Sequence, residues 1–352
     1  MARITASSLH RLVCSIFKSA GSEPREAGLI ADQLVDANLC GHDSHGVIRI
    51  PGYIEQMRAK RLLPNKRAKI VANFGATTIL DGQLGFGQVI GHEAMTIGIE
   101  ASAEHGVALV GTRNSGHLGR IGYWAEIAAM AGRASLHFIS AASPGGAQVA
   151  AFGGRDRRMA ANPMAMGMPV KDQPPIILDF ATSATAVGKV RVAQNRGEKL
   201  PQACIVDADG HLTDDPKALF GDKPGAIIPF GGHKGFALNV FNDIFGGALT
   251  GAGIPHKGER SSVQSGNNML SIFIAPDRFL DVEGMAAQLK EYIEWLAASE
   301  PMEAGQKVRV PGVGVAMERD RRKAQGIELE ELTWKAIVAA GEQVGLKRDD
   351  LQ

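Results

Sequence analysis

Helical patterns at both ends of the chain enclose a middle in which strand and helix patterns alternate. Residues 5–40 and the segment Leu329–Gly341 carry apolar residues at helical spacing. From about residue 70, short apolar runs bounded by glycine take over. This arrangement predicts an α+β (mixed α/β) fold. We expect a discontinuous helical domain (residues 1–75 with 285–352) around a mixed-sheet domain (residues 76–284).

The expected elements of the middle follow from apolar runs and the turns between them. We expect strands at 77–82, 107–110, 136–139, 176–180 and 270–274, and a hairpin at 205–213. Helices are expected at 53–62, 89–105, 121–131, 184–194, 234–246 and 285–296, and a late strand at 307–310. The first 40 residues should form two helices that divide at Gly21-Ser22.

One stretch, Gly41–Tyr53, concentrates reactive side chains between glycines. It holds His42, Asp43, Ser44, His45 and Arg49 just after a helix that Gly41 can end. Such groups transfer protons and hold anions, and a turn presents them to a ligand. We interpret the stretch as a candidate active-site loop.

A second histidine lies in a similar setting. His117 stands among small and polar residues in Asn114–Arg120. Two histidines in turns favour acid/base chemistry, although a lone histidine is more often structural. Arg49 and Arg120 could hold a carboxylate through their planar guanidinium groups, or could be solvated.

Two further stretches run from a loop or a strand end into a helix. Asp179–Ser183 offers hydroxyls and backbone N–H groups, and Gly232–Gly235 contains His233 and Lys234. Both patterns suit an anion such as a phosphate, and both are equally explained by helix capping. The charged run Arg319–Lys323 is interpreted as a solvated face.

Two other motifs are weaker. Gly85-x-Gly87-x-x-x-Gly91 follows an expected strand, but its spacing exceeds that of a dinucleotide fingerprint by one residue, so we interpret it as a glycine-rich turn without a ligand. His42 and His45 could bind a metal ion with Asp43 and His117, as in a metal-dependent hydrolase. That set lacks the cysteine or spaced glutamate of usual zinc sites, so we predict no metal.

Composition narrows the class of partner. The chain has 38 Lys and Arg against 37 Asp and Glu, so its charge gives no reason to expect nucleic acid or an anionic membrane. Its 3 cysteines lie far apart, which fits a reducing cytoplasm rather than a disulfide framework.

Taken together and in order, these stretches resemble the malate/L-lactate dehydrogenase family. The similarity rests on Gly41–Gly46, Asn114-Ser115-x-His117, Gly153-Gly154 with Asn162-Pro163, Asp179-x-Ala181-Thr182-Ser183 and Gly232–Gly235, and it spans essentially the whole chain. Within the family, Asn38–Gly46 and Ile121–Glu126 are most similar to the hydroxycarboxylate dehydrogenases.

The resemblance implies a homodimeric oxidoreductase that uses NAD or NADP and has a non-Rossmann nucleotide-binding fold. It implies His45 or His117 as the acid/base group, and Ser44, Arg49 and Arg120 at the substrate. The cofactor residues that it implies are His45, Gly119, Arg120, Ile121, Asp179, Phe180, Ala181, Thr182, Ser183, His233, Lys234, Asn267, Gly312, Val313 and Gly314.

One departure concerns the cofactor. Many relatives carry an acidic residue in the late turn where this chain has Pro311-Gly312-Val313-Gly314. A carboxylate there would bind ribose hydroxyls or repel a 2′-phosphate, so its absence makes NADPH more plausible and leaves the choice open.

We therefore expect hydride transfer between nicotinamide and C2 of a small 2-oxo or L-2-hydroxy acid. His45 is the first choice for the proton, with His117 as its partner or as the true donor. Reduction of a cyclic imino acid is the alternative within the family. The metal-dependent hydrolase and a catalytically inactive binding protein are the more remote ones.

Overall fold

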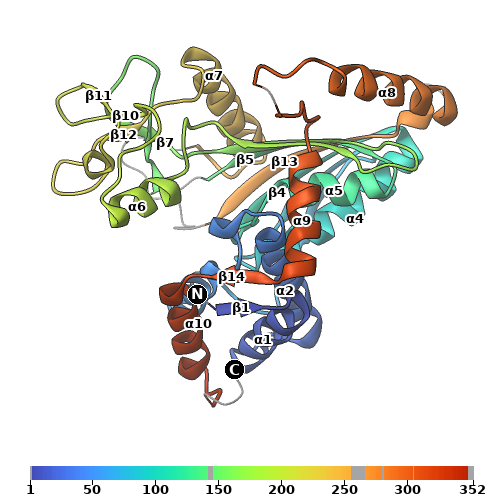
Figure 1. Cartoon of the computed structure of the whole chain (residues 1–352). Coiled ribbons are helices and arrows are strands. Elements are labelled where there is room, and N and C mark those ends of the chain that lie inside the picture. The colour runs from blue at the N-terminus through green and yellow to red at the C-terminus, as the bar shows by residue number, and fades with distance from the viewer. Residues whose placement is uncertain (1, 142–145, 255–265, 280, 304, 348–352) are drawn as a thin grey trace.

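A seven-stranded sheet forms the centre of the molecule (Figure 1). The computed structural model describes residues 2–141, 146–254, 266–279, 281–303 and 305–347. The sheet order is β2-β3-β4-β13-β5-β8-β9. Its strands are β2 (Lys69–Asn73), β3 (Thr77–Asp81), β4 (Val107–Ser115), β5 (Ala134–Ser140), β8 (Pro163–Met168), β9 (Ile176–Ala181) and β13 (Asn267–Ile274). Only β3 and β4 pair in parallel within it. This mixed sheet is unlike the parallel dinucleotide-binding sheet, and it confirms the expected fold class.

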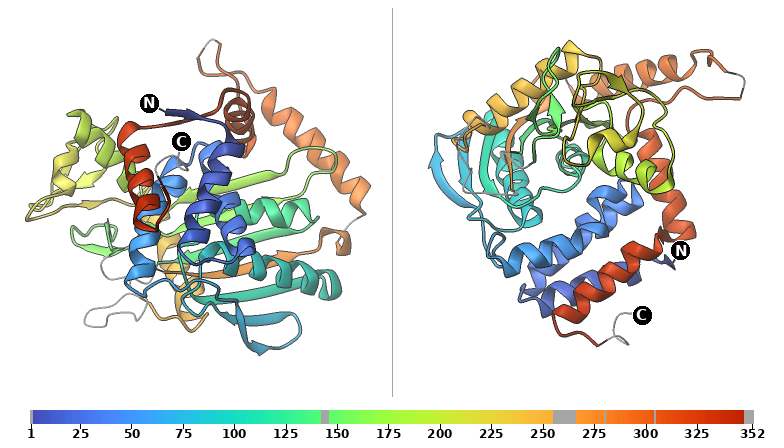
Figure 2. Two further views of the ribbon diagram at one scale, coloured as in Figure 1. Left: turned by 90° about the horizontal axis from the view of Figure 1, so that it is seen from below. Right: turned by 90° about the vertical axis from the view of Figure 1, so that its left-hand side faces the viewer.

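Helices cover both faces of this sheet (Figure 2). On one face, α4 (Gly87–His105) and α5 (Gly122–Met130) bury Met95, Trp124 and Ala125 against strand residues such as Phe273. The other face carries α7 (His233–Asn242), which continues into a π-helical turn at Asp243–Ala248.

A smaller five-stranded sheet, of order β11-β10-β12-β6-β7, stands beside the main one. It consists of β6 (Val149–Ala150), β7 (Arg157–Met159), β10 (Ile205–Val206), β11 (Leu212–Thr213) and β12 (Ala226–Ile227). The pairing of β10 with β11 confirms the expected hairpin, and α6 (Val187–Arg196) packs on this unit.

The two ends of the chain meet in one helical unit. Its elements are α1 (Ala6–Ser19), α2 (Pro24–Leu39), α3 (Ile50–Arg58) and α10 (Glu331–Gln343), with β1 (Ala2–Ile4) paired to β14 (Ile327–Leu329). Leu9, Ile16, Ile54 and Ile337 share its fully buried core. No helix in the described ranges is long and apolar enough to cross a membrane.

Two expectations about elements at the end of the chain change. The expected strand at 307–310 is wrong, because these residues pair with no strand. A helix that apolar spacing did not indicate, α9 (Val313–Gln325), follows the late turn. β2 belongs to the main sheet rather than to the helical unit. The helix α8 (Val282–Ala297) starts beside that sheet, where Lys171 pairs with Glu283.

Candidate active site

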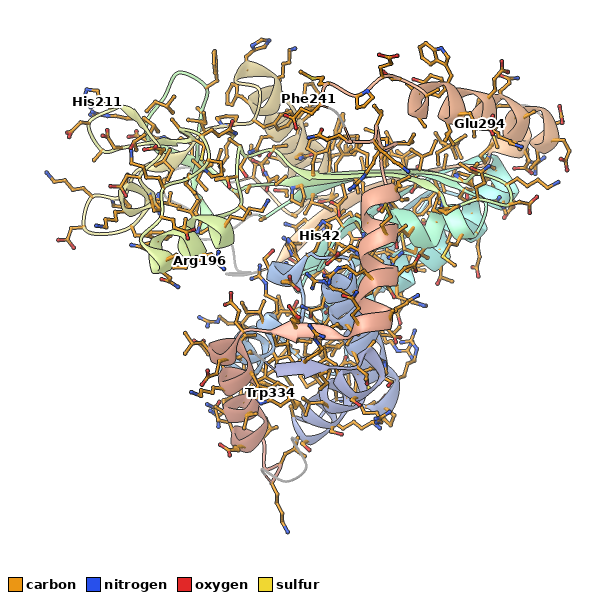
Figure 3. All side chains as sticks on the ribbon, in the orientation of Figure 1. His42, Arg196, His211, Phe241, Glu294 and Trp334 are labelled. Carbon is orange, nitrogen blue, oxygen red and sulfur yellow. The ribbon has the colours of Figure 1, made fainter. Side chains whose placement is uncertain are left out.

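The loop after α2 is held in shape by a buried asparagine. Asn38 Oδ1 accepts the backbone N–H of Val47 at 2.8 Å, and its Nδ2 donates to Asp43 Oδ1 at 2.6 Å. A Cβ on Gly46 would stand only 2.2 Å from Asn38 Oδ1, so this close approach requires glycine. Two short 3₁₀ turns, Asp43–His45 and Val47–Arg49, result. They place the loop between the helical unit and the sheet, where Figure 3 labels His42.

His45 and His117, which are 72 residues apart in the chain, face each other at the end of this loop. His45 Nδ1 lies 3.3 Å from His117 Nε2. The ring planes differ by 7° and the centroids are 5.3 Å apart, so the nitrogen edges, not the faces, are in contact. The structure thus brings together the two histidines that the sequence singled out.

His117 is supported by the glycine-rich turn before α4. A Cβ on Gly87 would lie 2.2 Å from the backbone oxygen of His117, and a Cβ on Gly116 would lie 2.8 Å from that of Gly85. Gly85-x-Gly87 therefore lets two loops touch. This contact is a scaffold for His117, in agreement with the interpretation of the motif as a turn.

Both histidines are held in the neutral form. Burial, followed by the positive Arg49, lowers the pKa of His45 to about 3. The same two causes lower the pKa of His117 well below its usual value. A neutral imidazole carries one proton and one lone pair, so the pair can both donate and accept a proton near neutral pH.

Arg49 lies exposed beside the pair. Its Nε donates to the backbone oxygen of Ser44 at 2.7 Å, which fixes the direction of the guanidinium group. Within the described ranges it makes no other side-chain hydrogen bond, so the two terminal nitrogens are left for a ligand. A carboxylate matches that fork.

Arg120, in contrast, is buried and paired through one of its terminal nitrogens. Its side chain is 1% exposed, and Nη2 lies 2.9 Å from Asp36 and 3.0 Å from Glu126. Arg319 of α9 contacts the same two carboxylates. The four side chains form an ion cluster that joins α2, α5 and α9. Nε and Nη1 of Arg120 are buried and have no hydrogen-bond partner among the described residues. Arg319, interpreted from sequence as solvated, is a member of it, and that interpretation is wrong.

The segments expected at the cofactor converge around β9. Asp179 Oδ2 accepts the N–H of Gly122 at the start of α5, so it links β9 to the Gly119–Ile121 loop. Thr182 donates through its hydroxyl to the backbone oxygen of Asn162, and Ser183 bridges to Pro229. Phe180 packs edge-on against Phe230.

Two further segments expected at the cofactor lie at the exposed N-terminal ends of helices α7 and α9. His233 and Lys234 lie exposed in the first turn of α7, after Gly231 and Gly232 with φ of 55° and 63°. Gly312 has a φ of 96° and lies against Pro175 and Ile177, and the space beside Gly314 at the start of α9 is open. The backbone N–H groups at the start of a helix suit a dinucleotide pyrophosphate. No described contact joins His233 or Lys234 to the histidine pair.

Asn267 holds the loop that leads to the cofactor segment, since its Oδ1 accepts the N–H of Leu118 at 2.9 Å. Gln33 Nε2 donates to the backbone oxygen of Leu118 at 2.8 Å, and a Cβ on Gly119 would lie 2.1 Å from Gln33 Oε1. The loop is therefore fixed from two sides.

The interpretation of His42 and His45 as metal ligands has no support from a group of ligating side chains in the described residues. His42 turns its Nδ1 toward the backbone oxygen of Cys40 at 3.2 Å. Across the residues with described positions, no three His, Cys, Asp or Glu side chains are grouped as metal ligands. All three cysteines are free thiols.

Sequence reasoning missed the groups that hold these residues. Asn38 and Asn162 stood in motifs of the resemblance without a role, and Gln88 was not singled out, although all three are buried. Arg322 of α9 was assigned to solvent although it binds Asp43. Tyr53 was noted in the loop without a role, although its hydroxyl touches His117.

Comparisons with known proteins place the chain in a family. A family model for malate/L-lactate dehydrogenase matches residues 4–338. A hydroxycarboxylate dehydrogenase B from Escherichia coli O157:H7 is 42% identical over 352 residues, with 99% of this chain and 96% of that protein covered. Both findings confirm the resemblance seen in the motifs.

Solved structures of related enzymes have the same fold as this chain. The sulfolactate dehydrogenase from Methanocaldococcus jannaschii superposes with a TM-score of 0.89 at 31% identity, and 99% of each chain is covered. A delta1-piperideine-2-carboxylate reductase from Pseudomonas syringae pvar. tomato gives a TM-score of 0.83 at 28% identity, with 97% of this chain and 100% of that chain covered.

Proposed function

The chain belongs to the malate/L-lactate dehydrogenase family, and we propose that it transfers a hydride between NAD(P)H and C2 of a small 2-oxo or L-2-hydroxy carboxylic acid. The observation that carries this proposal is the neutral His45–His117 pair beside Arg49, whose terminal nitrogens are free of described partners. A carbonyl group next to a carboxylate needs both a proton donor and an anion clamp.

The residues have distinct proposed roles. Arg49, directed by its bond to Ser44, holds the C1 carboxylate and so fixes the approach of C2. His45 gives its proton to the carbonyl oxygen, on which negative charge builds, and His117 supports it. Arg120 keeps the cofactor loop in place through Asp36 and Glu126.

The proposed cofactor is NAD or NADP, which supplies the hydride when bound. Asp179–Ser183, the Gly119–Ile121 loop, Asn267 and the starts of α7 and α9 would hold it. The basic pair His233-Lys234 at the start of α7, together with the absence of an acidic residue from Gly312–Gly314, is compatible with a 2′-phosphate. We also propose a cytoplasmic homodimer.

The test is a substrate panel run with both NADH and NADPH. Oxidation of the cofactor by 2-oxo acids supports the proposal. A comparison of the rates with NADH and with NADPH gives the cofactor preference. Turnover with cyclic imino acids and none with 2-oxo acids would favour the imino acid reductase, the activity for which the Pseudomonas relative is named. Nucleotide-induced thermal stabilisation without turnover would indicate a binding protein.

A further inference from the structure

Behind the histidine pair lies a buried tyrosine whose hydroxyl is in contact with His117. Tyr53 Oη is 2.7 Å from His117 Nδ1 and 3.2 Å from Gln88 Nε2. Tyr53 is 3% exposed, and Phe17 and Phe86 pack against its ring at centroid distances of 6.3 and 5.9 Å. The packing leaves the hydroxyl no other described partner, so the four side chains Gln88, Tyr53, His117 and His45 form one hydrogen-bonded chain.

The direction of the hydrogen bonds along this chain follows from counting protons. Gln88 presents its Nε2, not its Oε1, to Tyr53, and an amide nitrogen can only donate, so Tyr53 Oη accepts from it. The single phenolic proton then points to His117 Nδ1, the acceptor within reach. A neutral His117 that accepts at Nδ1 carries its proton on Nε2, and it donates that proton to His45 Nδ1. A neutral His45 that accepts at Nδ1 must carry its own proton on Nε2.

We propose that Gln88 and Tyr53 are positioning residues that set both histidines as Nε2–H tautomers, so that His45 presents a proton, not a lone pair, to the substrate oxygen. This inference rests on the proposed function, because it assigns His45 as the group that faces the substrate. Within the described ranges, His45 Nε2 has no hydrogen-bond partner, which leaves that proton for a ligand.

The same chain can supply the proton without forming an imidazolate. As His45 Nε2 gives its proton to the carbonyl oxygen, the His117 Nε2 proton moves to His45 Nδ1, and the Tyr53 proton moves to His117 Nδ1. The negative charge comes to rest on Tyr53 Oη. A solvent proton that enters at His45 Nε2 then drives the same two shifts in reverse and restores the phenol.

The charges around the chain favour this resting place. Burial raises the pKa of Tyr53, while Arg49 and the Gln88 N–H, which both favour the phenolate, oppose that rise. Arg49, His42 and Arg120 are the positive or titratable groups that face His45, and each disfavours an imidazolium there. A positive Arg49 favours the loss of a proton from the phenol, which leaves a negative charge, and disfavours a positively charged imidazolium.

A consequence is that the two directions of the reaction need opposite states. Reduction uses the phenol form of Tyr53. Oxidation of a hydroxy acid needs the phenolate form, in which His45 Nε2 is unprotonated and can accept a proton. Since burial raises the Tyr53 pKa, the oxidation rate should climb as the solution becomes more alkaline, while the reduction rate declines over the same range.

The test measures tautomers in the ligand-free protein by ¹H–¹⁵N correlation after ¹⁵N-histidine labelling. We expect Nε2–H for both His45 and His117 in the wild-type protein. Tyr53→Phe should introduce Nδ1–H signals at His117, because the donor to Nδ1 is lost and the ring packing is kept. Tyr292→Phe removes the same atom from the exposed face of α8, so it is the matched control and should leave both tautomers unchanged.

Two results would overturn the proposal: a wild-type His117 protonated at Nδ1, or unchanged tautomers in a folded Tyr53→Phe. The wild-type spectrum decides even if the variant fails to fold. The measurement uses neither substrate nor cofactor, so its failure is distinct from failure of the substrate panel. If the panel succeeds, Tyr53→Phe should lower kcat for reduction by about a hundredfold with an unchanged KM, and a change confined to KM would contradict the relay.

Discussion

Arg322 of α9 binds Asp43 of the active-site loop through two parallel hydrogen bonds, of 2.7 and 3.1 Å. The same guanidinium group donates to the backbone oxygen of Asn38 at 2.7 Å. A residue 279 positions downstream thus anchors the loop that carries His45. Since the pair is bidentate and Arg322 is only 15% exposed, it restrains the loop more than an ordinary surface pair does.

Arg322→Lys should therefore lower kcat/KM for the 2-oxo acid by about tenfold, which corresponds to about 1.4 kcal/mol. Lysine keeps the charge but cannot form the fork, so the loop loosens. Steady-state kinetics measure the effect. Arg321→Lys is the control, because the partners of Arg321 among the described residues are Glu318 and Gln325 of its own helix. Equal kinetics for the two variants would mean that Asp43 needs no anchor.

Substitution of each histidine tests its role. His45→Asn should cut turnover by about a hundredfold or more if His45 delivers the proton. His117→Asn should also lower the turnover of reduction by about a hundredfold, as Tyr53→Phe does, because it breaks the relay between Tyr53 and His45. Single-turnover rates measured under saturating substrate provide the comparison. Near-normal turnover of His45→Asn would transfer the donor role to His117.

Arg49→Lys should raise KM for the 2-oxo acid and change kcat less, since a point charge holds a carboxylate without the fork. The Nε bond to Ser44 is lost as well, so the ligand-binding group is no longer directed. The measurement is KM with a series of 2-oxo acids. Arg25, an exposed arginine that pairs with Glu93, provides the matched Arg25→Lys control. An unchanged KM would remove Arg49 from the site.

Arg120→Met tests the assignment of Arg120 to the ion cluster. Removing one cation leaves Asp36 and Glu126 incompletely paired, with Arg319 as their remaining partner. We expect a loss of about 3 kcal/mol in the free energy of unfolding, measured in urea. A stable protein with a raised KM for the 2-oxo acid would instead return Arg120 to the substrate, as the resemblance implied.

The sequence predicted those elements whose apolar residues have a regular period. α1 and α2 carry apolar residues at helical spacing, β3 alternates between buried and half-buried residues, and β13 is a largely buried strand, so their patterns were sufficient. In contrast, α9 buries no residue at all. It is held by Arg319 and Arg322, and ion pairs to distant carboxylates leave no periodic signal. The same cause explains why the run Arg319–Lys323 was assigned to solvent.

The candidate site shows the same division. His45, His117 and Arg49 could be found because reactive side chains between glycines are unusual. Their contacts could not be found, because they depend on which loops meet across 72 residues of chain. Gln88 lies inside a helix whose sequence gives no reason to single it out. The expected strand at 307–310 failed because alternation alone cannot show whether a sheet edge is available.

A last prediction concerns pH. His137 of β5 is fully buried between Ser271 and Ser135, at 2.9 and 3.0 Å, and burial lowers its pKa to about 3. The unfolded chain binds a proton near pH 6.5 and the folded chain resists it, so this contribution to stability is present above pH 6.5 and is lost on acidification toward pH 3. The slope for one such group is about 1.4 kcal/mol per pH unit.

His137→Gln should reduce the slope of unfolding free energy between pH 6 and 4 by about 1 kcal/mol per pH unit, as measured by urea denaturation across that range. Glutamine can still hydrogen-bond a serine but does not titrate. His45 and His117, whose pKa values are also lowered, keep the remaining slope in the same direction. The wild-type protein, measured over the same pH range, is the reference. An unchanged slope in His137→Gln would show that His137 accepts a proton without cost in the folded protein.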